Sequence, residues 1–310
     1  MSRPTTYGVS TLGCALEGML SVARAAEDAE LDAVWASEFY THSATVALAA
    51  MTYATERLRL GSSIMYGVGR SPLVLATELR DLDQLSGGRI VAGLGNGTKR
   101  MISDWHGWDP DAPAVRMEEL VPLLRQIWRL HEGPVRHEGC FYRMNLVPTA
   151  PVSAPLRTEI PVMLAAVRPR MCEAAGRVAD GLAGHPLFTV KYVQEVVRPA
   201  IARGAARGER DPAGCELLGM VISVIHEDRE HARREAAAQL AFYSSVKTYD
   251  QVLDAFSARA SRSARRSRAA TWRRCTRWSP TRCSTRWPSS ARRPRRSATG
   301  CGASRASSTT

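Results

Sequence analysis

A regular alternation of apolar strand-like segments with amphipathic helical segments runs through most of this chain, and it limits the fold more than any other feature. The expected strands span residues 6–11, 31–37, 57–66, 89–94, 160–165, 181–184 and 216–225. The expected helices span residues 16–30, 44–54, 72–85, 117–130, 170–179, 192–207 and 229–242, with a hairpin around 139–146. Strands that are each followed by a helix favour an α/β fold with a parallel sheet. Seven such pairs favour a (β/α)8 TIM barrel over an open sheet, with the eighth βα unit missing.

The alternation stops after residue 256, and the last 54 residues have a different composition. Residues 257–310 contain 15 Arg, no Lys, Asp or Glu, and no Leu, Ile, Val, Met, Phe or Tyr. Without large apolar side chains this segment cannot offset the chain entropy lost on folding, so it is expected to be disordered. The chain therefore divides into a barrel domain, residues 1–256, and an Arg- and Ser-rich tail, residues 257–310.

Two interpretations of the tail are open. An Arg-rich segment with Trp272, Trp278 and Trp287 as stacking groups could bind nucleic acid. The composition is also typical of a GC-rich coding sequence read out of frame, which is the interpretation we favour. In that case the chain could be an inactive, truncated barrel, and the charge of the tail says nothing about partners.

Charge and composition exclude several classes of protein. The formal net charge is +12, but 15 of the 42 basic residues lie in the tail, which leaves 27 basic and 30 acidic residues in the barrel domain. We therefore expect no specific nucleic-acid binding.

The sequence also lacks the signals of several other classes. It contains no run of eighteen apolar residues that could span a membrane, and the first seven residues do not resemble a secretory signal. Seven cysteines without a CxxC pair favour a reducing cytoplasm over a disulfide or zinc scaffold. The histidine spacings predict no metal site, and no GxSxG or Walker motif occurs.

Candidate functional residues follow directly after the expected strands. In barrel enzymes the active site is built from residues at the carboxyl ends of the strands. Glu38 follows the second strand and could orient a substrate or act as a base, and the nearby His42 could carry a proton. The sequence Gly-Leu-Gly-Asn-Gly at 93–97 follows the fourth strand, where glycines let the backbone approach a cofactor. A solvated loop and a tight turn are the alternative interpretations of these two segments. Thr98 stands where a dinucleotide motif needs its third glycine.

Two further strand ends carry polar side chains. Arg168 and Arg170 begin the helix after the fifth strand, where backbone N–H groups and guanidinium groups could bind an anion. The alternative is a surface turn whose arginines face water. His185 ends the sixth strand, and we interpret a single histidine there as structural.

Taken together, residues 5–256 resemble the bacterial luciferase-like oxidoreductases, especially the actinobacterial branch that uses the deazaflavin coenzyme F420. The segments that carry the resemblance are 26–35 (AEDAELDAVW), 57–64 (RLRLGSSI), 70–76 (RSPLVLA), 85–97 (LSGGRIVAGLGNG), 165–171 (AAVRPRM) and 175–181 (AGRVADG).

The resemblance implies a (β/α)8 barrel that holds a flavin or deazaflavin at its mouth, with F420 as the expected cofactor and FMN as the alternative. In the deazaflavin branch a non-prolyl cis peptide lies behind the ring, and Ser63–Ile64 matches that position. Gly95, Asn96 and Gly97 match the loop near the ring, and Ala166, Val167 and Arg168 match the segment that holds the cofactor phosphate.

The chain also departs from the family pattern. Deazaflavin sugar-phosphate and alcohol dehydrogenases commonly have Asp-His after the second strand, where this chain has Glu38-Phe39. They often have Glu shortly after the fourth-strand glycines, where this chain has Thr98-Lys99. Those activities are therefore disfavoured. The expected function is a monooxygenase or hydride-transfer reaction on a small organic substrate, with a homodimer as a candidate assembly.

Overall fold

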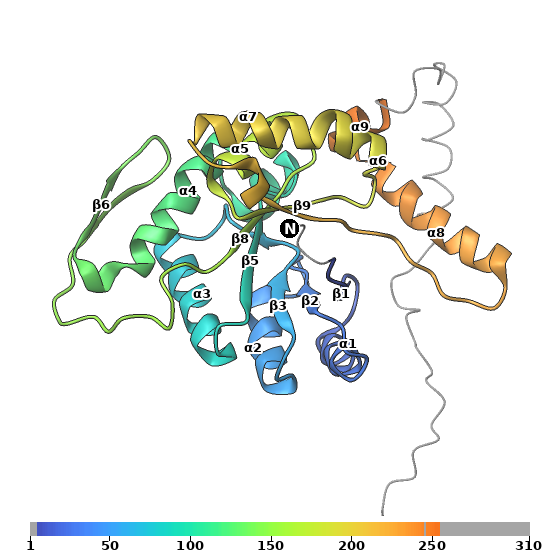
Figure 1. Ribbon diagram of the computed structural model, residues 1–310, viewed down its shortest axis with the longest axis horizontal. Coiled ribbons are helices and arrows are strands. Elements are labelled where there is room, and N and C mark those ends of the chain that lie inside the picture. The colour runs from blue at the N-terminus through green and yellow to red at the C-terminus, as the bar shows by residue number, and fades with distance from the viewer. Residues whose placement is uncertain (1–4, 245, 255–310) are drawn as a thin grey trace, which may run out of the picture. The chain divides into compact units, whose positions relative to one another are not determined.

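The computed structural model describes residues 5–244 and 246–254, and each expected strand and helix has a counterpart there (Figure 1). The main sheet consists of β1 (Gly8–Ser10), β2 (Ala33–Ala36), β3 (Arg59–Ser62), β4 (Met65–Tyr66), β5 (Ile90–Gly95), β8 (Val162–Ala165), β9 (Gly181–Ala183) and β10 (Glu216–Leu218). A separate hairpin consists of β6 (Val135–Glu138) and β7 (Arg143–Leu146).

The helices alternate with these strands along the chain. The α-helices are α1 (Leu16–Asp28), α2 (Ala44–Ala54), α3 (Pro72–Ser86), α4 (Pro113–Trp128), α5 (Pro169–Val178), α6 (Val190–Tyr192), α7 (Arg198–Arg207), α8 (Arg229–Ser244) and α9 (Asp250–Asp254). Short helical turns are η1 (Met101–Trp105), η2 (Leu130–Glu132), η3 (Val193–Val197), η4 (Pro212–Gly214) and η5 (Lys247–Tyr249).

The strands pair in parallel in the order β1-β2-β3-β5-β8-β9-β10, with β4 beside β5. This order follows the chain, as a (β/α)8 barrel requires, and the sheet curls into a half-barrel with helices around it (Figure 1). Within the described residues, no further strand joins β10 to β1. The predicted α/β barrel fold is therefore confirmed. The predicted tail at 257–310, its boundary at residue 256 and its out-of-frame origin lie outside the described residues.

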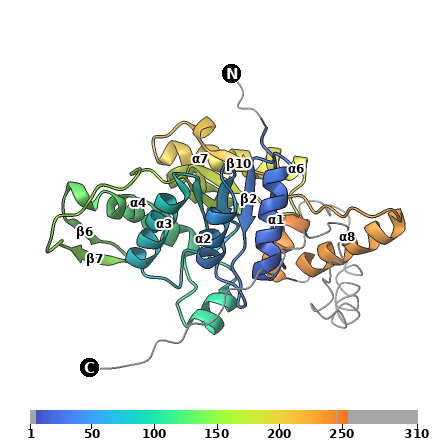
Figure 2. The ribbon, with the colours of Figure 1, turned by 90° about the horizontal axis from the view of Figure 1, so that it is seen from below.

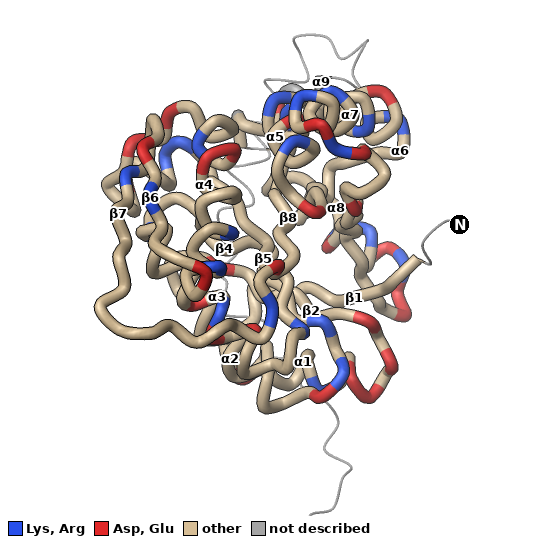
Figure 3. The backbone as a smooth tube through the Cα atoms, turned by 60° about the vertical axis from the view of Figure 1, so that its left-hand side comes forward, with Lys and Arg blue, Asp and Glu red and all other residues tan. Residues whose placement is uncertain are grey.

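Local sequence signals set the ends of several helices. The Ser71 side chain accepts a hydrogen bond from the N–H of Val74, and Pro72 occupies the first turn of α3. Gly87 ends the same helix in the left-handed conformation, with φ of +67°. Basic and acidic residues alternate along the outer helices (Figure 3), which fits the nearly neutral charge balance of the barrel domain.

Two predicted strands differ from those observed. The strand predicted at 57–66 is divided into β3 and β4 by Ser63–Ile64, whose peptide bond is cis. The strand predicted at 216–225 ends at Leu218, because no partner strand among the described residues continues the ladder beyond it. The apolar side chains that follow are exposed, with Val221 79% and Ile225 fully accessible.

Helix α8 lies apart from the other helices. It contains no buried residue, and Figures 1 and 2 both show it extending away from the curled sheet.

Helices α5 and α7, by contrast, are packed with their backbones in direct contact. A Cβ added to Gly176 would overlap the carbonyl oxygen of Ile201, and one added to Gly204 would overlap that of Glu173.

Candidate active site

The predicted site residues meet at the edge of the sheet where the parallel strands end, which is where barrel enzymes bind their substrates. Ser63 and Ile64 separate β3 from β4, and Glu38 follows β2. The Glu38 N–H donates to the Ile64 carbonyl at 3.1 Å, and the Ser63 N–H donates to the Ala36 carbonyl at 2.7 Å. These bonds fix the ends of β2 and β3 relative to each other.

Gly95 lies where the ends of β4, β5 and β8 come together. A Cβ added to it would lie 3.0 Å from the Ile64 side chain and 3.3 Å from the Cβ of Ala165. Gly97 has φ of +65°, and an added Cβ there would lie 2.9 Å from the Tyr66 ring. We call Ser63, Ile64, Gly95, Asn96 and Gly97 the floor of the site. Because Gly95 has no side chain, the Ile64 and Ala165 side chains can pack close to the β5 backbone.

Asn96 is the amide residue of this floor. The side chain is enclosed, with only 9% of the residue exposed. Neither its amide oxygen nor its amide nitrogen has a hydrogen-bond partner among the described residues. Buried amides are nearly always hydrogen-bonded, so these two unpaired atoms indicate the place of a ligand.

The segment predicted to hold a phosphate begins the α5 helix. The Ala166 N–H donates to the Ala183 carbonyl at 3.3 Å, and the Val167 carbonyl accepts a hydrogen bond from the Tyr192 hydroxyl at 2.9 Å. Arg168 is exposed, and its Nε donates to the Thr248 carbonyl at 3.3 Å. These residues border the floor through β8, whose last residue contacts Gly95.

Arg170, the second arginine predicted at this helix start, takes part in a structural contact. Its guanidinium forms an ion pair with Glu118 of α4, whose carboxylate is 5% exposed and also binds Arg177 and Arg207. Arg170 thus holds α5 against α4, because a buried carboxylate needs its cations. Of the two predicted arginines, Arg168 is the one whose guanidinium forms no ion pair with the described residues.

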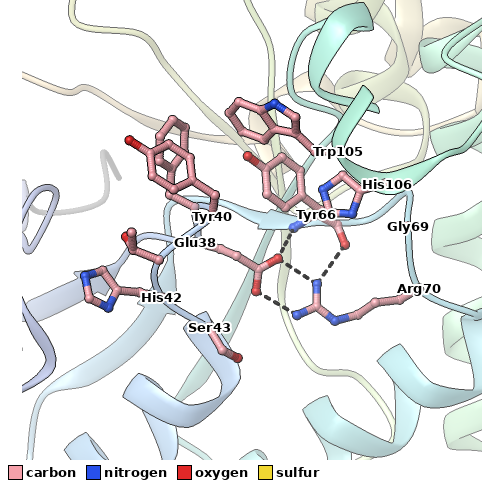
Figure 4. Close-up of a pocket in the computed structure, with 11 residues that line it drawn as sticks. Glu38, Tyr40, His42, Ser43, Tyr66, Gly69, Arg70, Trp105 and His106 are labelled. Carbon is pink, nitrogen blue, oxygen red and sulfur yellow. Dashed lines mark hydrogen bonds and ion pairs between the residues drawn. The ribbon is translucent and has the colours of Figure 1, made fainter. Parts of the chain in front are cut away.

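Beside the floor lies an open pocket of about 630 Å³, which we call the outer pocket (Figure 4). It is lined by Glu38, Phe39, Tyr40, Thr41, His42, Ser43, Tyr66, Gly69, Arg70, Trp105 and His106. Tyr66 belongs to both regions, because it lines the pocket while its ring faces Gly97.

The Glu38 carboxylate is fully engaged by hydrogen-bond donors. Arg70 binds it through both terminal nitrogens, at 2.7 Å to Oε1 and 2.6 Å to Oε2. The backbone N–H groups of Tyr66 and Ala44 donate to the same carboxylate at 3.1 and 3.2 Å. The side chain of Glu38 is 7% exposed, and its hydrogen bond raises the pKa of Arg70 above the ordinary value. Glu38 thus ties the end of β2 to β4 and to the start of α2.

His42 lies at the rim of the outer pocket. Backbone bonds of 3.2 and 3.4 Å join it to Phe39 and form a tight turn after β2. Figure 4 shows its ring pointing away from the Glu38 carboxylate. The two predicted catalytic residues therefore line one pocket but do not contact each other.

His185 lies at another strand end, two residues after β9. Its Nδ1 accepts a hydrogen bond from the Leu187 N–H at 3.2 Å, and its Nε2 is buried without a partner among the described residues. The rings of Tyr243 and Tyr249 pack on it, with centroids 4.7 and 4.1 Å away. Burial lowers the pKa of His185 to about 4, so the imidazole is neutral at pH 7.

This buried histidine predicts an acid-sensitive fold. The folded-state pKa of about 4 lies below the ordinary value of 6.5, so the unfolded chain takes up this proton first as the pH falls. The free energy of unfolding should therefore decrease from pH 6.5 to about pH 4, by up to about 1.4 kcal/mol per pH unit. Urea unfolding of the wild type and of His185→Gln at several pH values measures this. Parallel profiles for the two proteins would contradict the prediction.

Several residues of the site are absent from the sequence-based prediction. Arg70 comes 32 positions after Glu38, and only the fold shows that the two form an ion pair. Trp105 and His106 lie in a connection with no apolar periodicity, where η1 forms a π-helical turn. Aromatic residues within a long polar connection were the signal available in the sequence.

Within residues 5–244 and 246–254, no group of three or more His, Cys, Asp or Glu side chains could hold a metal ion. No helix in the same part of the chain is long and apolar enough to cross a membrane.

Comparison with known proteins identifies the family. Residues 3–278 match the family model described as luciferase-like monooxygenase. An uncharacterized protein of Mycobacterium tuberculosis is 34% identical over 229 residues, which cover 72% of this chain and 67% of the relative. A putative coenzyme F420-dependent oxidoreductase of the same organism is 32% identical over 230 residues, 71% of this chain and 65% of that protein. The chain thus spans about two thirds of the length of these relatives.

Among solved structures, the coenzyme F420-dependent tetrahydromethanopterin reductase of Methanopyrus kandleri has a similar fold, with a TM-score of 0.68. The match has 24% sequence identity and covers 80% of this chain and 74% of that one. With the family match over most of its length and the barrel fold described above, the chain belongs to the luciferase-like monooxygenase family.

Proposed function

We propose that this protein is an oxidoreductase that binds a flavin-type cofactor on the floor of the site, with coenzyme F420 as the first choice and FMN as the alternative. The observation that carries the proposal is Asn96, a buried amide whose two polar atoms have no partner among the described residues, next to Gly95, where the Ile64 and Ala165 side chains pack close to the backbone. A planar ring system with polar edges suits this arrangement, because it needs an apolar contact surface and partners for its nitrogen and oxygen atoms.

The chain offers a residue for each part of such a cofactor. Ile64 and Gly95 would support the ring, and the Asn96 amide would hydrogen-bond its polar edge. Arg168 would face the phosphate with an exposed guanidinium at the start of α5. When bound, a cofactor of this type supplies hydride or oxygen chemistry, while the protein provides position and electrostatics.

Other residues of the chain would position the substrate. Glu38 has no free acceptor capacity, so we assign it the role of holding the loop that lines the outer pocket, in place of a general base. His42 stays a candidate for proton exchange at the pocket rim. Burial and the nearby Glu38 raise the pKa of Tyr66 to about 12, which keeps its hydroxyl protonated as a hydrogen-bond donor.

The choice of F420 over FMN draws on the putative F420-dependent oxidoreductase among the curated relatives. The substrate would be a small organic molecule in the outer pocket. A homodimer stays a candidate assembly.

Cofactor titration tests the proposal. F420 and FMN are added separately to the full chain, and cofactor fluorescence reports binding. Gly95→Val pushes a branched side chain against Ile64 and Ala165 and should weaken binding at least tenfold, because Ile64 would be displaced from its position under the ring. Asn96→Ala removes one hydrogen-bonding amide and should weaken binding by about tenfold.

The matched control is Gly214→Val, since a side chain at Gly214 meets nothing within 4 Å. This variant should bind the cofactor as the wild type does. If neither cofactor binds the wild type, or if the two floor variants bind like the control, the proposed site is wrong.

A further inference from the structure

The outer pocket has an aromatic wall that the proposed cofactor does not use. Phe39 and Tyr40 come from the loop after β2, and Trp105 comes from η1. The Trp105 ring meets the other two edge to face, with centroids 5.2 and 5.5 Å apart. These residues are 39, 71 and 45% exposed, so part of each aromatic ring is accessible to a ligand. Three exposed aromatic rings in mutual contact form a candidate surface for stacking.

The charged groups of the pocket neutralise each other. Glu38 and Arg70 are the lining residues with permanent charge, and they form a bidentate ion pair. The Nε of Arg70 lies a further 3.3 Å from the carboxylate of Glu78. The one lining cation thus faces two carboxylates and has no charge left for an anionic ligand. A phosphate or carboxylate substrate would find no unpaired arginine or lysine in this pocket.

The Tyr66 hydroxyl is a polar group that lines the pocket (Figure 4). The Tyr66 hydroxyl makes no hydrogen bond with the described residues, although the Tyr66 backbone is held by Glu38 and Arg70. The Tyr66 ring lies next to Gly97 and also contacts the His106 ring, with a centroid distance of 4.8 Å. A ligand oxygen bound to this hydroxyl would therefore lie next to the floor.

We propose that the outer pocket binds an uncharged aromatic substrate, which packs against Trp105, Phe39 and Tyr40 and directs a carbonyl or hydroxyl oxygen to Tyr66. The proposal names the substrate class of the proposed oxidoreductase and rests on that function. Trp105 is then a specificity-determining residue and Tyr66 a substrate-binding one. Aromatic packing supplies the affinity, and the single hydrogen bond sets which end of the molecule faces the floor.

The test uses three naphthalene probes and the full chain without cofactor. The probes are 2-acetylnaphthalene, which is an uncharged ketone, 2-ethylnaphthalene, which lacks the oxygen, and 2-naphthoate, which is an anion. Calorimetry or saturation-transfer NMR gives their dissociation constants. We expect the ketone to bind in a saturable manner, several-fold more tightly than the hydrocarbon and at least tenfold more tightly than the carboxylate.

Two variants and two matched controls test whether Trp105 and Tyr66 bind the ketone as proposed. Trp105→Ala should weaken ketone binding about tenfold or more, and Trp108→Ala, at a tryptophan of similar exposure (40%) outside the pocket lining, should not. Tyr66→Phe should reduce ketone binding about three- to tenfold and leave 2-ethylnaphthalene unchanged. Tyr53→Phe, at an 80% exposed tyrosine of α2, should leave both unchanged. Thermal unfolding checks that each variant is folded.

Three results would overturn the proposal: no saturable ketone binding, equal effects of the two tryptophan variants, or carboxylate binding as tight as that of the ketone. A loss of cofactor binding alone bears on the proposed function and leaves this result unaffected, because the probes are measured without cofactor.

Discussion

Replacing Gly93 by alanine is expected to lower the free energy of unfolding by about 3 kcal/mol or more, enough to unfold much of a marginally stable domain. A Cβ on Gly93 would overlap the backbone carbonyl of Ser62, at the point where β5 passes the end of β3. The Ser62 hydroxyl also accepts a hydrogen bond from the Gly93 N–H at 3.0 Å and donates one to the Gly93 carbonyl at 2.8 Å. No side-chain rotation can relieve a clash with this fixed backbone.

Urea unfolding of the wild type and Gly93→Ala measures the effect, with Gly214→Ala as the control at a glycine surrounded by open space. The control should stay within about 0.5 kcal/mol of the wild type. An equally small effect of Gly93→Ala would show that β3 and β5 do not approach each other as described.

A second large effect is expected at Arg70. Arg70→Ala leaves the Glu38 carboxylate, which is 7% exposed, without its cation. Breaking a buried ion pair from one side costs about 3–5 kcal/mol, because the remaining charge stays desolvated. The double variant Glu38→Gln, Arg70→Met should lower the free energy of unfolding less than Arg70→Ala alone does, since no charge is then left unpaired.

The control for Arg70 is Lys99→Ala, which removes an ion pair with Asp111 whose side chains are 72 and 70% exposed. Such surface pairs contribute about 0–1 kcal/mol. A double-mutant cycle for positions 38 and 70 gives the coupling energy directly. A coupling near zero would mean that the two side chains act independently.

The sequence was sufficient to predict the order of strands and helices. The spacing of apolar residues differs between strands and helices, because it reflects which side chains of each element are buried. Helix α2 (Ala44–Ala54) has the predicted ends, since Ser43 caps it and α2 carries its own apolar pattern. The predicted length of β10 was wrong. A strand extends only as far as a neighbouring strand pairs with it, and apolar residues alone do not show where that pairing ends. The division at Ser63–Ile64 was anticipated from family resemblance and not from any local pattern.

Within the site, the prediction placed residues on strand ends but not in relation to one another. Glu38 was identified by its position after β2, but its role depends on Arg70, which no spacing in the sequence connects to it. Arg170 and Arg168 look equivalent in the sequence, and only the packing of α4 on α5 distinguishes them. The free amide of Asn96 and the aromatic wall at Trp105 also follow from tertiary structure alone.

The backbone contact between α5 and α7 also has a dynamic consequence. Helices that touch through Gly176 and Gly204 have no side-chain layer between them to repack, so they can move only as one rigid body. Arg168 at the start of α5 moves with this body, so the side of the site that we propose to bind the cofactor phosphate should be rigid before any ligand arrives. Trp105, by contrast, belongs to a single π-helical turn with little buried surface. Amide hydrogen exchange should therefore be slow in α5 and α7 and fast in η1. We therefore expect the α5 side of the site to be preorganised and the η1 side to adapt its shape to what it binds.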